Sequence, residues 1–362
     1  MRVIQILPTL AYGDAVGNDT IALKNVLEDM GYETQIYAES IMSSSLEGKT
    51  ALNIKQIPRL KDDDIIIYHL STGSDLNYKI AEYKGRKIIV YHNITPSEFF
   101  RGYSYIFERV TVTGLKGACF LADKVDYCLA DSEFNKQNLR ELGYKVPIDV
   151  LPIIIPFDDY KKEPNQDIME KYKDGKHNII FTGRIAPNKY HQDIITAFAC
   201  YKKYYDSEAR LFLVGSYKET DTYYRKLKKY VELLAVEDIV FTGHIKFEEI
   251  LAYYRVADVF VCMSEHEGFC VPLVEAMFFG IPIIAYNCTA VPITLGDGGI
   301  LIDKKNPIET AALINRLISD NVLRDRIREN QKKQLEDFQY EKITGMFHKY
   351  LENFINSQNQ SD

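Results

Sequence analysis

Short runs of apolar residues recur along the chain, and polar or glycine-containing segments followed by stretches with helical spacing separate them. Such runs are typical of strands buried on both faces of a parallel sheet, and their alternation with helical stretches is typical of α/β architecture. In the first half the pattern predicts strands at residues 3–7, 33–38, 64–69, 86–91, 126–130 and 148–151. In the second half it predicts strands at residues 178–181, 210–214, 239–241, 258–262 and 282–285. The chain is therefore expected to form two doubly wound sheets.

The length of the chain, 362 residues, also favours two domains of ordinary size. Regular patterning stops between residues 151 and 164, where prolines and polar residues interrupt it, so we expect the interdomain linker there. The predicted domains are residues 1–155 and 156–335. The last segment, 336–362, follows the second sheet pattern and predicts an amphipathic helix to about residue 355, then a frayed tail from residue 357.

One stretch, residues 264–280, combines the features of an anion site. A polar, glycine-containing loop follows a predicted strand, and Pro272 stands where the first helical residue is expected. The free amides of the first turn and the positive end of the helix dipole face the carboxyl end of the sheet, where open α/β sheets bind ligands. Glu267 in the loop and Glu275 in the first turn flank this point. Both carboxylates can face one small polar ligand while the amides hold its phosphate, and a sugar nucleotide fits this description.

Further candidate residues follow strands elsewhere in the chain. Arg184 and Lys189 come after the first strand of the second half, and their charge suits a diphosphate, which gains negative charge as a sugar departs. The alternative is a pair of solvated surface cations. His92 ends a strand in the first half, where either a ligand contact or a buried, hydrogen-bonded side chain is expected. His69 ends the preceding strand and is interpreted as structural.

Several classes of function are excluded. The loop after the first strand contains only Gly13 and Gly17 as glycines and lacks the dinucleotide-binding fingerprint, which argues against a nicotinamide cofactor. The acidic run at 62–64 precedes its strand and so lies at the wrong end of the sheet for a catalytic metal. The net charge of −7 argues against a nucleic-acid surface. No metal, no cofactor and no nucleic acid are expected.

Membrane insertion is also not expected. No apolar run reaches the roughly 20 residues that span a bilayer. The six cysteines show no Cys-x-x-Cys spacing and are typical of reduced residues in a cytosolic protein. The aromatic-rich segment 97–123 suits either a core helix or a membrane-facing surface, and we predict a core helix because the first half has no basic excess.

The motifs resemble those of the family-4 retaining glycosyltransferases. The pattern Glu267-Gly-Phe-x5-Glu275 resembles the signature of that family. The other matching motifs, in order along the chain, are Phe181-Thr-Gly-Arg184 with Lys189, Leu213-Val-Gly215, Phe241-Thr-Gly243, Ala257-Asp-Val-Phe260 and Val291-Pro-x-Thr-Leu-Gly296. The chain departs from the family pattern at Cys270 and Tyr190, where glycine is usual or frequent, and at Ile293, where Glu commonly follows Pro.

The resemblance implies the GT-B fold, in which two Rossmann-like domains face each other across a cleft and the terminal helix crosses back to the first domain. It implies a retaining, metal-independent hexosyltransferase with a nucleoside-diphosphate sugar as donor and a glycan or lipid-linked acceptor. The donor is expected on the second domain and the acceptor on the first.

The resemblance also implies roles for individual residues. Glu275 is expected to hold the ribose hydroxyls, Glu267 the sugar, and Arg184 and Lys189 the diphosphate. Gly13 is expected to approach the donor phosphates, and His92 the transferred sugar or the acceptor. The amides expected to hold the sugar and the phosphates are those of Gly268, Phe269 and Cys270, and those of Val271 and Leu273, respectively.

Two alternatives to a glycosyltransferase stay open. One is a non-catalytic subunit that binds sugar nucleotides, and the other is a phosphorylase or epimerase on the same fold. The segment His92-Asn-Ile-Thr-Pro96 is similar to bacterial transferases of mannose or rhamnose type that build surface polysaccharide. The expected location is the cytoplasm, with peripheral contact at the inner face of the membrane left open.

Overall fold

The computed structural model describes residues 1–11, 13–42 and 46–357. Contacts within the chain divide it into two compact units. The first unit comprises Met1–Ser97, Ile106–Ile155 and Asp337–Asp362, and the second comprises Glu98–Tyr105 and Pro156–Glu336. The tail predicted from residue 357 lies outside the described residues except for Ser357.

The first unit contains a parallel sheet of seven strands in the order β3-β2-β1-β4-β5-β6-β7. These strands are β1 (Arg2–Leu10), β2 (Glu33–Ile41), β3 (Ala51–Asn53), β4 (Ile65–Leu70), β5 (Arg86–Tyr91), β6 (Tyr127–Ala130) and β7 (Ile148–Val150). Strand order reverses between β1 and β4, so this pair forms the topological switch point where open α/β sheets bind ligands. Every residue of β4 is buried, as expected for a central parallel strand.

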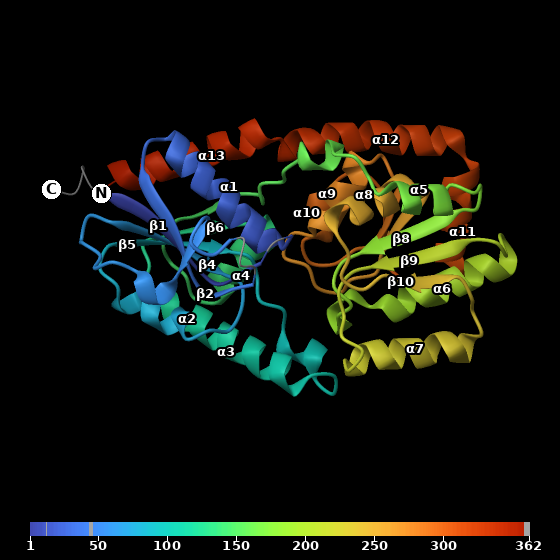
Figure 1. Ribbon diagram of the computed structural model, residues 1–362, viewed down its shortest axis with the longest axis horizontal. Helices are drawn as coiled ribbons and strands as arrows, with labels where there is room; N and C mark the ends of the chain where they lie inside the picture. The colour runs from blue at the N-terminus through green and yellow to red at the C-terminus, as the bar shows by residue number, and fades with distance from the viewer. Residues whose placement is uncertain (12, 43–45, 358–362) are drawn as a thin grey trace. The chain divides into compact units, whose positions relative to one another are not determined.

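Helices cover both faces of the first sheet. One face carries α1 (Ala15–Asp29) and α13 (Tyr340–Asn356), and the other carries α2 (Leu76–Lys79) and α3 (Tyr105–Leu121) (Figure 1). Helix α4 (Glu133–Glu141) connects β6 to β7. The terminal helix α13 packs against α1 through an apolar face. The C-terminal helix is therefore part of the first unit.

The second unit contains a parallel sheet of six strands in the order β10-β9-β8-β11-β12-β13. Its strands are β8 (Asn178–Thr182), β9 (Arg210–Val214), β10 (Ile239–Phe241), β11 (Val259–Cys262), β12 (Ile283–Tyr286) and β13 (Ile300–Ile302). Here the switch point lies between β8 and β11. The loops that follow these two strands are therefore the expected ligand-binding loops of the unit.

Helices also cover both faces of the second sheet. Figure 1 shows α6 (His191–Tyr204) and α7 (Thr222–Leu234) on one side, with α8 (Phe247–Arg255), α9 (Val271–Phe278) and α12 (Asn321–Leu335) on the other. The remaining helices of this unit are α5 (Gln166–Tyr172), α10 (Val291–Leu295) and α11 (Pro307–Ser319). Helix α11 packs against α6.

The predicted fold class is confirmed, and each predicted strand is present. The pattern missed β3 and β13, which have three residues each and are mostly half-buried. Strands this short and this exposed leave no apolar run that distinguishes them from a loop. Among the described residues, no helix combines the length and the apolar character needed to cross a bilayer.

The prediction of a core helix for the aromatic-rich segment 97–123 is wrong at its start. Tyr105 and Ile106 are 71% and 72% exposed. The preceding residues pack within the second unit instead, where the ring centroid of Phe99 lies 6.4 Å from that of Tyr190. Aromatic content predicted burial correctly for some of these side chains, but local sequence does not reveal which unit a connecting segment joins.

Candidate active site

Two loops meet at the switch point of the second sheet. The loop after β8 contains Arg184 and the short helical turn η5 (Pro187–Lys189), and the loop after β11 leads into α9. Asn188 joins them, because its side-chain amide donates to the carbonyl of His266 at 3.2 Å and its own carbonyl accepts from the amide of Glu265 at 2.9 Å. These two hydrogen bonds fix the position of Lys189 relative to the loop after β11.

Lys189 and Glu267 form a buried ion pair. The ammonium nitrogen of Lys189 lies 2.6 and 2.7 Å from the two carboxylate oxygens of Glu267, which is only 7% exposed. Burial alone lowers the pKa of Lys189, but the Glu267 carboxylate outweighs it, so the pKa of Lys189 is raised. The Lys189 ammonium is therefore charged near neutral pH. Arg184, by contrast, is exposed at the end of β8.

Glu275 lies in α9 and accepts hydrogen bonds from two tyrosines. The hydroxyl of Tyr160 donates to one carboxylate oxygen at 2.9 Å, and the hydroxyl of Tyr254 donates to the other at 2.6 Å. Burial raises the pKa of Glu275, whereas these two hydrogen bonds lower it. An ionised carboxylate has about four acceptor positions, so two remain for ligand hydroxyls. No sequence motif pointed to Tyr160 or Tyr254.

The start of α9 differs slightly from the prediction. The helix begins at Val271, so Pro272 is its second residue rather than its first. The amide of Leu273 donates to the carbonyl of Cys270 at 3.0 Å, and the carbonyl of Phe269 accepts from the hydroxyl of Thr294 at 2.5 Å. The amide of Leu273 is therefore already engaged within the first turn. Gly268 lies in the loop directly before Phe269.

Two departures from the family pattern coincide with left-handed backbone. Tyr190 has φ 50° and Cys270 has φ 75°, values at which a non-glycine residue costs roughly 1–2 kcal/mol. This explains why glycine is common at both positions in the family. The Lys305 ammonium lies 3.8 Å from the centroid of the Tyr190 ring, and this cation–π contact favours the observed position of Tyr190.

The first unit brings His92 into a hydrogen-bonded chain. Its Nδ1 lies 3.0 Å from an oxygen of Asp131, and its Nε2 lies 2.9 Å from Nδ1 of His69. Nε2 of His69 lies 2.9 Å from the side-chain oxygen of Gln5. The His92 side chain is only 2% exposed. Both of its ring nitrogens already have partners, so a ring nitrogen of His92 bonds to a ligand only if one of these hydrogen bonds is exchanged.

Asp19 in α1 lies beside this chain, and burial raises the pKa of its carboxyl to about 7. Its Oδ1 accepts from the amide of Ile154 at 2.9 Å. Gly13 precedes α1 with φ 76°, the left-handed region that favours glycine. Sequence reasoning missed Asp19 and Asp131. The available signal was that Asp131 directly follows a predicted strand, at the carboxyl edge of the sheet.

Two groups of side chains in the described part of the chain come close enough to share a metal ion. They are Asp19, His69 and His92 in the first unit, and Cys262, Glu267 and Cys270 in the second. In the first group the two histidines are hydrogen-bonded to each other, and in the second the Lys189 ammonium holds the carboxylate. Because these partners already satisfy the donor atoms, we assign a metal to neither group.

The acidic run at 62–64 is engaged in ion pairs. Asp62 pairs with Lys84 at 3.1 Å, and Asp64 pairs with Arg2 at 2.5 Å. The Arg2 guanidinium lowers the pKa of the Asp64 carboxyl. The run lies before β4, at the amino end of the strand. These carboxylates are therefore structural.

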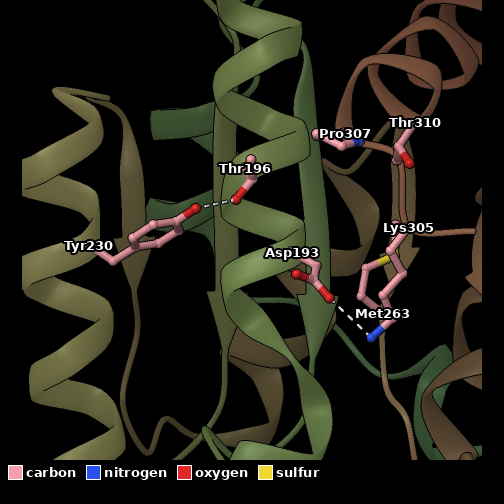
Figure 2. A pocket seen from close by; sticks show the side chains of 7 residues that line it. All are labelled: Asp193, Thr196, Tyr230, Met263, Lys305, Pro307 and Thr310. Carbon is pink, nitrogen blue, oxygen red and sulfur yellow. Dashed lines mark hydrogen bonds and ion pairs between the residues drawn. The ribbon is translucent and has the colours of Figure 1, made fainter.

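A hollow of about 230 Å³ lies among α6, α7 and α11 (Figure 2). Lys305 in this hollow bonds to Asp193 at 3.0 Å and to Glu265 at 2.7 Å. The hydroxyls of Thr196 and Tyr230 bond to each other at 2.8 Å. We place the candidate site at the switch-point loops and not in this hollow, because open α/β sheets bind ligands at the switch point.

The chain is similar to known glycosyltransferases. Residues 163–334 match the family model described as glycosyl transferases group 1. An uncharacterized glycosyltransferase of Methanocaldococcus jannaschii is 28% identical over 268 residues, which cover 72% of this chain and 65% of that protein. The GDP-mannose-dependent alpha-(1-6)-phosphatidylinositol monomannoside mannosyltransferase of Mycobacterium tuberculosis is 25% identical over 220 residues, 57% of this chain and 55% of that protein. The chain spans about half to two thirds of the length of the curated relatives it matches.

The solved structures give the same fold. The crystal structure of Anabaena HepE in complex with UDP and glucose matches with a TM-score of 0.76, covering 98% of this chain and all of that chain (100%) at 17% sequence identity. At this identity the match shows the fold alone. The family match, the ordered motifs and the two parallel sheets agree with one another. Residues 163–334 therefore match the glycosyl transferases group 1 family, and the chain has the GT-B fold.

Proposed function

We propose that the protein is a retaining, metal-independent glycosyltransferase that moves a hexose from a nucleoside-diphosphate sugar to a glycan or lipid-linked acceptor. The observation that carries this proposal is the buried pair of Lys189 and Glu267 at the switch point of the second sheet, next to the start of α9. A buried pair of opposite charges at a ligand-binding edge is costly to maintain for stability alone. It is well suited to receive a diphosphate and a sugar.

In this proposal the donor lies along the two loops and α9. Arg184 and Lys189 bind the diphosphate. Glu275 accepts hydrogen bonds from the ribose hydroxyls at the carboxylate positions that Tyr160 and Tyr254 do not occupy. Glu267 meets the sugar, together with the amides of Gly268, Phe269 and Cys270. The amide of Val271 and the positive end of α9 hold the phosphates. We leave out the amide of Leu273, because it already donates to the carbonyl of Cys270.

The proposed chemistry follows from the state of Glu267. Both of its carboxylate oxygens contact the Lys189 ammonium, which makes Glu267 a poor nucleophile. We therefore propose that the acceptor oxygen attacks on the face that the phosphate leaves, so that configuration is retained. The bond from the anomeric carbon to the phosphate oxygen breaks, the bond to the acceptor oxygen forms, and the departing phosphate takes the acceptor proton. Arg184 and Lys189 stabilise the charge that grows on the diphosphate.

The relatives differ in donor. By its name, the M. tuberculosis relative depends on GDP-mannose, whereas HepE was crystallised with UDP and glucose. We propose a donor of mannose or rhamnose type, because mannosyltransferases recur among the sequence relatives and because of the His92-Asn-Ile-Thr-Pro96 segment.

A screen of nucleotide sugars tests the function. A donor at 100 times its Kd is expected to add about 2.7 kcal/mol to the free energy of unfolding and to raise the Tm. GDP-mannose and dTDP-rhamnose are expected to stabilise more than UDP-glucose. Transfer by the stabilising donor is then measured with EDTA present, and the rate is expected to stay the same. Loss of transfer with EDTA that manganese or magnesium restores contradicts the metal-independent mechanism.

The same assays distinguish the alternatives. Stabilisation without turnover under any acceptor condition supports a non-catalytic binding subunit. Turnover of the donor with orthophosphate supports a phosphorylase, and turnover without any acceptor supports an epimerase.

A lipid-linked acceptor requires contact with a membrane, and we propose that α3 makes it from the cytoplasmic side. The exposed face of this helix carries Ile106, Val112 and Phe120, together with Arg109 and Lys116. Apolar side chains mixed with basic ones suit an anionic lipid surface. Sedimentation with anionic vesicles is expected to be weakened by Ile106→Asp, and binding unaffected by this change rules out α3 as the contact.

A further inference from the structure

Hydrogen bonds link Gln5 to His69, His69 to His92 and His92 to Asp131. The orientation of the Gln5 amide determines which ring nitrogens of the two histidines carry hydrogens. The side-chain nitrogen of Gln5 donates to the carbonyl of Thr20 at 3.0 Å. A carbonyl only accepts, so this bond fixes the orientation of the amide and turns its oxygen toward His69. An amide oxygen also only accepts. The hydrogen between Gln5 and His69 is therefore on Nε2 of His69.

The position of the hydrogen on His69 determines one hydrogen of His92. Burial lowers the pKa of His69 well below its ordinary value, so its ring is neutral and carries one hydrogen. With that hydrogen on Nε2, Nδ1 of His69 is an acceptor. The 2.9 Å contact between the two rings therefore requires a hydrogen on Nε2 of His92.

The geometry of the two rings fits a hydrogen bond. Their planes lie within 9° of each other and their centroids are 5.2 Å apart. That separation is about the nitrogen–nitrogen distance plus one ring radius on each side, so the rings of His69 and His92 lie edge to edge. The N–H of His92 then points along the lone pair of His69. A metal ion bound by both nitrogens lies off this line and requires both rings to turn.

A further proton lies between Nδ1 of His92 and the carboxyl group of Asp131. Its 3.0 Å contact with Asp131 needs a hydrogen, placed either on the imidazole or on the carboxyl. Burial raises the pKa of Asp131, so burial does not by itself decide between these two positions. Burial alone lowers the pKa of His92, but its interactions with Asp131, and with Asp19 and Asp14, outweigh burial, and the pKa of His92 is raised. The surrounding acids therefore favour the proton on the imidazole.

We propose that His92 is held as an imidazolium that donates a hydrogen bond from each ring nitrogen, and that Gln5 and His69 are positioning residues that hold it in this state. One oxygen of Asp131 has no hydrogen-bond partner among the described residues, so the His92 cation is the group that compensates this buried carboxylate. An imidazolium has no lone pair. His92 therefore contributes a fixed positive charge at the carboxyl edge of the first sheet and does not abstract a proton from the acceptor.

Nitrogen NMR of the full chain with labelled histidine tests the protonation state, which does not depend on the proposed function. The seven histidines are assigned with His92→Gln and His69→Gln variants. Near neutral pH, we expect both nitrogens of His92 to be protonated, and His69 to be neutral with its hydrogen on Nε2. In Asp131→Asn the His92 ring is expected to become neutral and to keep its hydrogen on Nε2.

Two matched variants test whether the protonation of His92 depends on the hydrogen-bonded chain or changes with any buried substitution. Gln5→Met removes the acceptor that fixes His69, so the His69 hydrogen can move to Nδ1 and His92 is expected to lose a proton at lower pH than in the unaltered protein. Thr34→Val removes a buried hydroxyl of β2 outside the chain and is expected to leave both histidine spectra unchanged. An unprotonated nitrogen on His92 in the unaltered protein at neutral pH overturns the proposal. So does added Zn²⁺ that displaces the hydrogen between the two rings.

The effect of the His92 charge on sugar transfer rests on the proposed function, and it is measured separately as the pH dependence of the transfer rate. The transfer rate is expected to fall at alkaline pH as the imidazolium loses its proton, and Gln5→Met is expected to move this fall to lower pH. A rate that rises as His92 deprotonates makes His92 a base and overturns the proposal. If the expected NMR spectra are found but no transfer occurs with any nucleotide sugar, the proposed function fails and the proton assignment stands.

Discussion

Lys189→Ala is expected to lower kcat by roughly 10²- to 10³-fold and to lower the free energy of unfolding by about 3–5 kcal/mol. The kinetic loss is expected because, in the proposed mechanism, the ammonium stabilises the charge that grows on the leaving diphosphate, as a preorganised oxyanion donor does. The loss of stability arises because the Glu267 carboxylate is left buried without its cation. Turnover and urea unfolding measure the two effects separately.

Two further variants serve as controls for Lys189→Ala. Arg184→Ala is expected to lower kcat by a similar factor and to change stability by only about 0.5 kcal/mol, because the side chain is exposed. Combining Lys189→Ala with Glu267→Gln removes both charges and is expected to restore much of the stability but none of the turnover. Equal stability losses for Arg184→Ala and Lys189→Ala, or unchanged turnover in either, contradict these roles.

Glu275→Ala is expected to weaken donor binding by about 1–3 kcal/mol, because the ribose hydroxyls lose their acceptor. The same change is expected to lower the free energy of unfolding by about 2–4 kcal/mol. Two buried tyrosine hydroxyls, those of Tyr160 and Tyr254, lose the carboxylate that accepts from them. Calorimetry with the nucleoside diphosphate measures the first effect, and urea unfolding measures the second.

Tyr160→Phe is the matched control for Glu275→Ala. It removes one of the two hydrogen bonds to Glu275 and keeps the carboxylate, so donor affinity is expected to change little while some stability is lost. An unchanged donor affinity in Glu275→Ala, or a loss as large in Tyr160→Phe, refutes the ribose assignment.

The sequence by itself determined the fold class and the location of the two loops at the switch point of the second sheet. Central parallel strands are buried on both faces, so each leaves an apolar run that is visible without any tertiary information. Residues directly after such runs lie at the carboxyl edge of the sheet, and this rule pointed to Arg184, Lys189, Glu267 and His92. The rule is local, so it can be applied to the sequence alone.

The tertiary structure decided which of these groups meet and in what state. Gln5 and His69 are 64 residues apart, His92 and Asp131 are 39 apart, and Lys189 and Glu267 are 78 apart. No local pattern encodes such pairs, because they depend on strand order and on the reversal of that order between β1 and β4 and between β8 and β11. The same contacts set the charges of Lys189 and His92, since burial and a neighbouring carboxylate shift each pKa in opposite directions. His92 was therefore visible in the sequence as a candidate, but its protonation is a property of the fold.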